Sequence, residues 1–264
     1  MKKITLAMLL LTSFGFVQAA ELEDAQKLWD DKQFYKAFQI FNKLAHEGNF
    51  SAQWQLGEMY GFGEGTVEDA DKAEFWLKQA AAKGSAEAAT SLAAVKQRQA
   101  HRADIAYYTT SFDGANAAYA KFGCTRPAIP ARSTTNEEIA AVNASIGAWT
   151  QCYDRFVSNL RNVAPPEKTI SSSILPLMNN EEFKKSSVLI SKVYENIWNN
   201  AKQIEKGVAE ESNSWKAATE KFASDNNSVA KEIKVNTENE MQRVSRLQSE
   251  LITRKQVLAV GMNK

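Results

Sequence analysis

AQWQLGEMYGFGEGTVEDADKAEFWLKQAAAKGSAEA, from Ala52 to Ala88, is the stretch that decides the fold. It predicts a helix, a glycine-rich elbow, a second helix and the start of a third. Ala52, Leu56, Met59 and Tyr60 recur at helical spacing, which places them on one face of the first helix. The stretch is therefore interpreted as two helices that pack against each other.

Glycines in this stretch have two expected roles. Gly57 removes a side chain where the partner helix must approach closely. Gly61, Gly63 and Gly65 supply the backbone freedom that the elbow requires, because glycine reaches conformations that other residues avoid. The elbow is not a phosphate-binding loop, since it lacks the Gly-Lys-Ser/Thr ending and no strand precedes it.

Helix boundaries are marked on both sides of the elbow. Ser51 is the expected N-cap of the first helix and Asp69 that of the second. Gly84 is expected to end the second helix in the left-handed region. The expected packing face of this helix comprises Ala73, Trp76, Leu77, Ala80 and Ala81.

This pattern resembles the Sel1-like repeat, a relative of the tetratricopeptide repeat. The matching positions are Leu56-Gly57, Met59-Tyr60, Gly63, Gly65, Asp69, Lys72-Ala73, Trp76, Ala80-Ala81 and Gly84. Thr66 departs from the pattern, which usually has valine there. The resemblance implies a surface that binds partner proteins and no enzymatic activity.

Partial repeats flank the complete one. Ala37, Ala45 and Gly48 recur as Ala73, Ala81 and Gly84, about 36 residues later, a period typical of stacked helix pairs. Ala88 and Leu92 begin a third unit, but no glycine elbow follows. Residues 20–102 are therefore predicted to form a short α-solenoid that ends in a polar capping helix.

Residues 1–19 have the pattern of an export signal. Lys2 and Lys3 precede an apolar stretch that is too short to span a membrane, and small residues stand at Val17 and Ala19. Cleavage is expected after Ala19, and the predicted location is the bacterial periplasm or the medium. No later segment of the mature chain is apolar enough to cross a membrane.

Residues 103–163 are predicted to form a separate helical module. It begins with an aromatic-rich helical stretch that has a potential interruption near Gly114. It continues through a loop that contains two prolines and ends in a long amphipathic helix. Thr135 and Glu138 have the spacing of a capping box for that helix. Cys124 and Cys152 are expected to form a disulfide, because free thiols are rare in exported proteins. A buried reduced pair is the alternative.

The remaining sequence predicts a connector and long helices. Residues 164–179 are rich in proline and serine and are the expected boundary. Residues 180–264 contain no proline and are predicted to form a helical hairpin or a coiled coil, with Asn180 as the first N-cap. Asp225, Asn226 and Asn227 are a potential break. The expected fold class is thus all-α throughout.

Composition excludes several functions. A formal net charge of +1 gives no electrostatic support for nucleic-acid binding. His46 and His101, the only histidines, lie far apart and have no cysteines near them, so no metal site is predicted. No catalytic residue and no cofactor are predicted either.

The preferred function is a periplasmic adaptor or scaffold whose repeats bind another envelope protein. Gln53, Trp54, Glu58 and Phe62 are the predicted partner-binding residues, since they lie off the packing face. For Trp54, packing between repeat units is the alternative. Two other hypotheses are a cell-envelope hydrolase acting on β-lactams or cell wall, and a structural protein that forms oligomers through its C-terminal helices.

Overall fold

The computed structural model describes residues 18–261, and the side chains of residues 18–246. It is helical and contains no strand among the described residues, which confirms the predicted all-α class. The predicted export signal lies almost entirely outside this range. Contacts divide the chain into two units, one of residues up to Lys121 with Val157–Trp198, the other of Phe122–Phe156 with residues from Asn199 onward.

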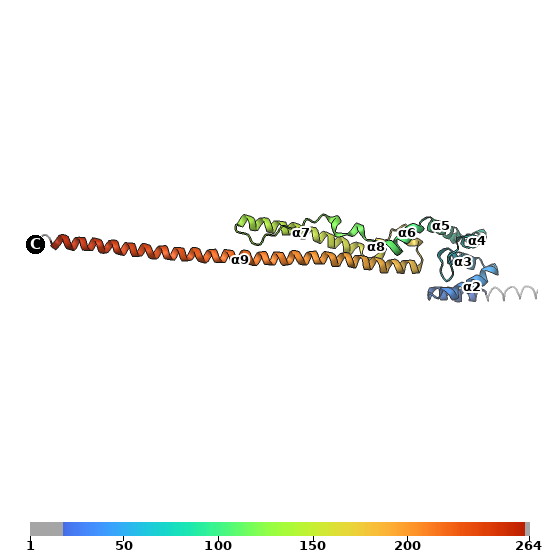
Figure 1. Ribbon diagram of the computed structural model, residues 1–264. Coiled ribbons are helices and arrows are strands. Elements are labelled where there is room, and N and C mark those ends of the chain that lie inside the picture. Colours follow the sequence, from blue (N-terminus) through green and yellow to red (C-terminus); the bar gives the residue numbers. More distant parts are fainter. Residues whose placement is uncertain (1–17, 262–264) are drawn as a thin grey trace, which may run out of the picture. The chain divides into compact units, whose positions relative to one another are not determined.

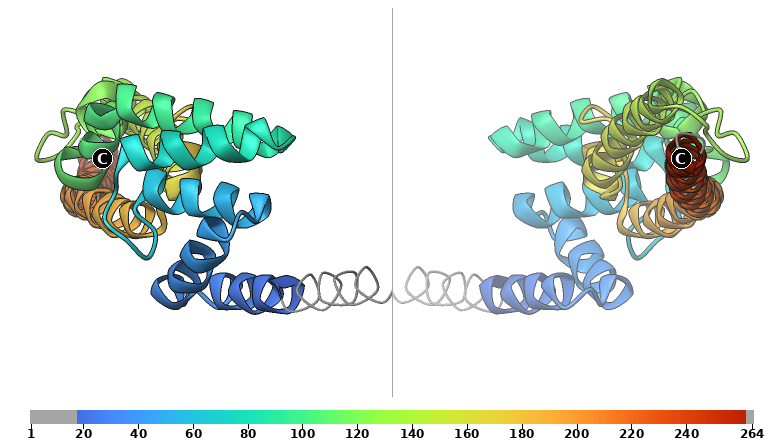
Figure 2. Two further views of the ribbon diagram at one scale, coloured as in Figure 1. Left: turned by 90° about the vertical axis from the view of Figure 1, so that its right-hand side faces the viewer. Right: turned by 90° about the vertical axis from the view of Figure 1, so that its left-hand side faces the viewer.

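The first unit begins with a short solenoid. Residues 18–30 form a helix, followed by α2 (Phe34–His46), α3 (Phe50–Phe62), α4 (Ala70–Ala82) and α5 (Ala86–Ala100). Each of α2 to α5 packs on the next, as Figures 1 and 2 show. Two buried clusters hold them together, one with Phe41, Leu44, Leu56 and Met59 and the other with Ala73, Leu77, Ala80 and Val95.

Close contact between these helices depends on two glycines of α3. A Cβ atom at Gly57 would lie 2.6 Å from Cγ of Leu77 in α4, and one at Gly61 would overlap Val95 of α5. Gly61 was expected in the elbow, but it lies inside α3 and is buried. Its role is therefore close packing, not backbone freedom.

The elbow between α3 and α4 begins at Gly63. Gly63 and Gly65 have φ angles of +69° and +72°, in the left-handed region, and Gly65 lies against the carbonyl group of Phe34. Asp69 caps α4 by accepting a 3.0 Å hydrogen bond from the Lys72 amide. The N-cap of α3 is Asn49, not Ser51, because the helix begins two residues earlier than predicted.

Residues 102–122 form short helical segments with an interruption at Gly114, where the sequence predicted a potential break. After α6 (Arg102–Ala106) the chain forms a π-helical turn, η1 (Tyr107–Ser111), and two short 3₁₀ segments, η2 (Ala115–Ala117) and η3 (Tyr119–Phe122). Gly114 interrupts the helix with a φ of +64°, and a Cβ there would lie 2.8 Å from Val193 Cγ1. Only glycine fits this turn.

The stretch predicted as a connector, residues 164–179, lies inside the first unit. It forms α8 (Pro166–Thr169) and η4 (Leu175–Leu177), and its apolar side chains Ile170, Ile174 and Leu177 are buried. The unit continues without interruption into the first part of α9 (Asn180–Gly261). The prolines therefore shape a packed segment that leads into α9.

The second unit contains α7 (Asn136–Val163) up to Phe156 and α9 from Asn199 onward, and Tyr153 Oη of α7 donates to Glu205 of α9 at 3.1 Å. The predicted capping box is present, with Thr135 and Glu138 each bonding the other's backbone amide. Cys124 and Cys152 form the predicted disulfide, with 5.5 Å between Cα atoms. The Trp215 indole donates to Ser133 Oγ, which ties the loop before α7 to α9.

The C-terminal helix is single and continuous, so the predicted hairpin is wrong. The helix passes through Asp225, Asn226 and Asn227 without a break. These residues are weak helix formers, and each lowers helix stability by less than about 1 kcal/mol relative to alanine. Proline, which usually breaks a helix, is absent from this stretch. The helix that packs beside α9 is α7, and residues 223–246 of α9 are all exposed. No described helix is both long enough and apolar enough to cross a membrane.

Candidate protein-interaction site

A cavity of about 420 Å³ lies in the first unit, next to the elbow. Helix α3 contributes Glu58 and Phe62, the elbow contributes Glu64, and the start of α9 contributes Asn179 and Asn180. We call it the elbow cavity, and its full lining is Trp29, Glu58, Phe62, Glu64, Glu167, Leu175, Met178, Asn179, Asn180 and Phe183.

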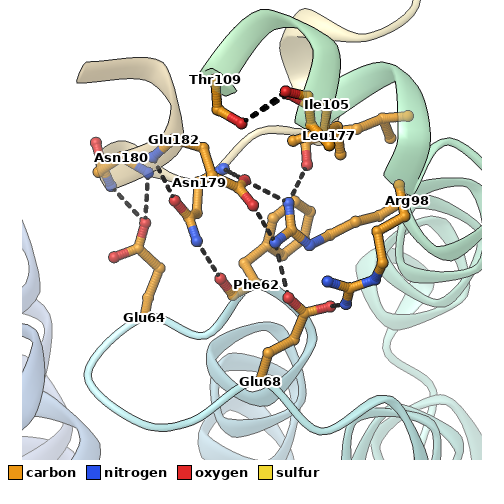
Figure 3. Close-up of polar contacts among 12 residues, drawn as sticks. Phe62, Glu64, Glu68, Arg98, Ile105, Thr109, Leu177, Asn179, Asn180 and Glu182 are labelled. Carbon is orange, nitrogen blue, oxygen red and sulfur yellow. Dashed lines mark hydrogen bonds and ion pairs between the residues drawn. The ribbon is translucent and has the colours of Figure 1, made fainter. Parts of the chain in front are cut away.

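The start of α9 is bound directly to the elbow (Figure 3). The backbone and side-chain nitrogens of Asn180 both donate to Glu64 Oε1 at 2.8 Å, and the Asn179 side chain donates to the Phe62 carbonyl at 2.8 Å. Asn179, and not the predicted Asn180, is the N-cap, since its Oδ1 accepts from the Glu182 amide. Asn180 is thereby available to bind Glu64.

Arg98 of α5 forms the centre of this arrangement (Figure 3). Its side chain is 1% exposed and donates to the Leu177 carbonyl at 2.6 Å, to Glu182 at 2.7 and 2.9 Å, and to Glu68 at 2.8 Å. Its guanidinium group also lies 5.5 Å from the ring centre of Phe62. Burial lowers the pKa of Arg98, but the hydrogen bonds of Glu182 and Glu68 raise it further, so the group stays charged.

Charge around Arg98 is balanced by Glu68 and Glu182. Glu68 also accepts from Gln99 at 2.8 Å and forms an ion pair with Arg102. A buried cation is tolerated when such partners satisfy it. The network fixes α5, the elbow and the start of α9 relative to one another, and thereby fixes this side of the elbow cavity.

The four predicted partner-binding residues have different surroundings. Gln53 is buried and donates to the Ala45 carbonyl at 3.0 Å, so the prediction that it contacts a partner is wrong. It lies on the side of α3 that faces α2. Trp54 is half-buried, and its indole donates to Ser91 Oγ of α5 at 2.8 Å. This contact agrees with the alternative given for Trp54, packing between repeat units. Only Glu58 and Phe62 line the cavity.

Glu58 is the carboxylate with the most unusual surroundings. It accepts a 2.6 Å hydrogen bond from Ser91. Burial raises the pKa of Glu58, and hydrogen bonds from Ser91 and Trp54 offset only part of that rise. The negative charge of Glu58 is thus poorly solvated, and a cation brought close to it would stabilise the charged form.

The cavity has a clear chemical character. Three carboxylates line it, from Glu58, Glu64 and Glu167, together with the aromatic rings of Trp29, Phe62 and Phe183. No lysine or arginine is among its described lining residues. Carboxylates attract cations and the faces of aromatic rings do the same, so the arrangement suits a positively charged group with an apolar stem.

Sequence reasoning missed Arg98, Glu64 and Glu68. A signal for Arg98 was available, since it lies three residues after Val95 and seven after Ser91, on the buried face of the capping helix. Its acidic partners come from the elbow and from α9, which are remote in sequence. Within the described part of the chain, no group of three or more residues is placed to hold a metal ion.

Comparison with known proteins identifies one region of the chain. Residues 50–85 match the family model described as Sel1 repeat, which covers α3, the elbow and α4. No curated protein and no solved structure matches the chain. Sel1 repeats generally mediate interactions between proteins.

Proposed function

We propose that this Sel1-repeat protein is a non-enzymatic adaptor of the bacterial cell envelope, which binds a partner protein at the elbow cavity. The observation that carries the proposal is the cavity itself, an acidic and aromatic concavity to which the region that matches the Sel1 repeat contributes Glu58, Phe62 and Glu64. The export pattern of residues 1–19 supports a periplasmic or secreted location.

The partner presents a lysine or arginine side chain to the cavity. Its charge lies near Glu58 and Glu167, and its alkyl stem packs on Phe62 and Phe183. Buried aromatic contacts with a desolvated cation contribute up to about 2 kcal/mol, and charge-assisted hydrogen bonds add to this. The uncompensated charge of Glu58 favours a cationic partner over a neutral one.

Site-specific photo-crosslinking in the producing bacterium tests this proposal. A photoreactive amino acid at the position of Phe183 should yield an adduct with a protein partner. The same substitution at Phe75, an exposed phenylalanine of α4 outside the cavity, should not.

A charge reversal then tests the chemistry of the site. Glu167 is exposed, so Glu167→Lys should reduce the adduct at position 183 without disturbing the fold. Glu23→Lys makes the same change at another exposed position of the first unit and should leave the adduct intact. Equal adducts at positions 183 and 75, or equal effects of the two reversals, would contradict the proposal.

A second candidate function, self-association through the C-terminal helix, is favoured by the exposed residues 223–246. Val229, Ile233, Met241 and Val244 are each at least half exposed and lie on one third of the helix circumference. Helices of this kind gain most of their stability from packing on a partner.

Sedimentation velocity of the whole mature chain and of a chain ending at Phe222 would test self-association. The cut at Phe222 keeps Trp215 and Thr219, which are buried, inside the protein. Self-association predicts that the whole chain sediments as a dimer or larger oligomer, whereas the truncated chain sediments as a monomer. If both chains sediment as monomers, this function is excluded and the adaptor proposal is unaffected.

A further inference from the structure

A second cavity of about 340 Å³ lies in the first unit, away from the matched repeat. We call it the tyrosine cavity. It is lined by Tyr107, Tyr108 and Phe112 of the segment after α6, and by Tyr194 of α9. The rest of its lining is Gly114, Ala115, Asn116, Ala117, Asn159, Val163, Lys168 and Thr169.

One wall of the cavity is aromatic. The Phe112 ring stacks on Tyr108 at 6.1 Å and meets Tyr194 edge to face at 5.6 Å, and Tyr107 packs on Tyr108 at 5.2 Å. Phe112 and Tyr194 are buried, so this wall is anchored in the core of the unit. Such a wall offers ring faces on which a cyclic ligand can stack.

A π-helical turn positions two tyrosines of this aromatic wall, Tyr107 and Tyr108. Tyr107 and Tyr108 begin the π-helical segment η1, where Thr110 Oγ1 donates to the Ala106 carbonyl at 2.7 Å and Thr109 Oγ1 donates to the Ile105 carbonyl at 3.1 Å. These hydroxyl groups add side-chain hydrogen bonds to the carbonyl groups of the preceding turn. Single π turns in proteins are frequent at functional sites.

The rest of the lining includes three polar side chains. Asn116, Asn159 and Lys168 line the cavity, and no hydrogen bond joins their side chains to another described residue. Tyr108 Oη accepts from the Ser171 amide at 3.2 Å, and its own proton remains available to donate. Tyr194 Oη is hydrogen-bonded to Thr169 Oγ1. Burial raises the pKa of Tyr194, so its hydroxyl stays protonated at neutral pH.

From this geometry we infer that the tyrosine cavity binds an acidic saccharide of one or two rings. Sugar rings present apolar faces to the tyrosines and hydroxyl groups to the two asparagines. Lys168 is the charged residue among the described lining, and it pairs with a carboxylate on the ligand.

Two other ligand classes fit less well. An aromatic acid would stack on the tyrosines, but it has too few polar groups for Asn116 and Asn159, and unpaired polar groups weaken binding. A quaternary ammonium ion would suit the aromatic wall, but Lys168 would repel it. The volume suits a ligand at the small end of the usual range for protein pockets.

Isothermal titration of the mature protein with three probes tests this inference. The probes are digalacturonate, the neutral disaccharide maltose, and benzoate as an aromatic acid. We expect saturable binding of digalacturonate, about tenfold weaker binding of maltose because the ion pair is lost, and the weakest binding of benzoate.

Matched variants locate the site. Lys168→Met should reduce the affinity for digalacturonate to that for maltose, whereas Lys185→Met, at an exposed lysine of α9 outside the cavity, should not change it. Circular dichroism establishes that each variant is folded. The inference is overturned if digalacturonate fails to bind the wild type, if benzoate binds more tightly than either sugar, or if the two lysine variants behave alike.

Discussion

Gly57 and Gly147 both lie inside helices, yet their surroundings differ completely. A Cβ atom at Gly57 would overlap Leu77, whereas nothing lies within 4 Å of a Cβ at Gly147. The first glycine is required by contact between α3 and α4, and the second only lowers the helix propensity of α7. The same residue type therefore has opposite effects on stability.

This contrast gives a first prediction. Gly57→Ala should lower the free energy of unfolding by about 1–3 kcal/mol, the usual cost of overpacking a close helix contact. Gly147→Ala should raise it by about 0.5–1 kcal/mol, since alanine is the better helix former. Urea unfolding of the two variants beside the wild type measures both, and equal shifts would contradict the described contact.

A second prediction concerns Arg98. Arg98→Met should cost about 3–5 kcal/mol of unfolding free energy, because Glu68 and Glu182 would lose the cation that compensates them. Arg102 binds the same Glu68 but is 55% exposed. Arg102→Met should therefore cost no more than about 1 kcal/mol. Similar losses in the two variants would show that the Arg98 network is not the main link between α5 and α9.

At the scale of elements, the disulfide joins the loop before α7 to the helix itself. Its cysteines are 28 residues apart in sequence. A link of this length is expected to contribute about 3–4 kcal/mol by restricting the unfolded chain. The loop also gains from the Trp215–Ser133 hydrogen bond, so it remains partly held without the disulfide.

The third prediction follows from this. The double variant Cys124→Ala, Cys152→Ala should unfold at lower urea concentration than the wild type under non-reducing conditions. In dithiothreitol the wild type should fall to the stability of the variant, which itself should not respond. A variant as stable as the oxidised wild type would contradict the expected contribution.

Element boundaries could be predicted in part. The Gly63–Gly65 elbow, the Asp69 cap and the Thr135–Glu138 capping box follow from local chemistry, which a sequence displays directly. The N-caps of α3 and α9 differ from prediction by one or two residues, because several neighbouring polar residues are suitable N-caps. The sequence predicts only a potential break at Asp225–Asn227, because weak helix formers alone do not show whether a helix continues, and α9 passes through them.

At the scale of the whole molecule, the function proposed above depends on export. The fourth prediction is that protein purified from the envelope begins at Ala20, as cleavage after Ala19 requires. Ala19→Arg should block cleavage, because signal peptidase needs a small residue at that position, while Gln18→Arg should not. N-terminal sequencing checks this, and wild-type protein that keeps residues 1–19 would contradict the predicted signal.

The sequence by itself determined the all-α class, the similarity of residues 50–85 to the Sel1 repeat, and the cysteine pair. Each depends on local spacing. Helix periodicity, glycine turns and caps involve residues that lie close together in the sequence. Two of the four predicted partner-binding residues, Glu58 and Phe62, also line the elbow cavity.

Only the tertiary structure decided the composition of both cavities. The elbow cavity joins α3 to residues more than a hundred positions away, such as Asn180. The burial of Arg98 and Gln53 likewise depends on which helix lies opposite. Hydrophobic periodicity predicts which face of a helix is buried, but it does not predict which element covers that face. Contacts distant in sequence form through packing of the whole unit, so a single sequence does not display them.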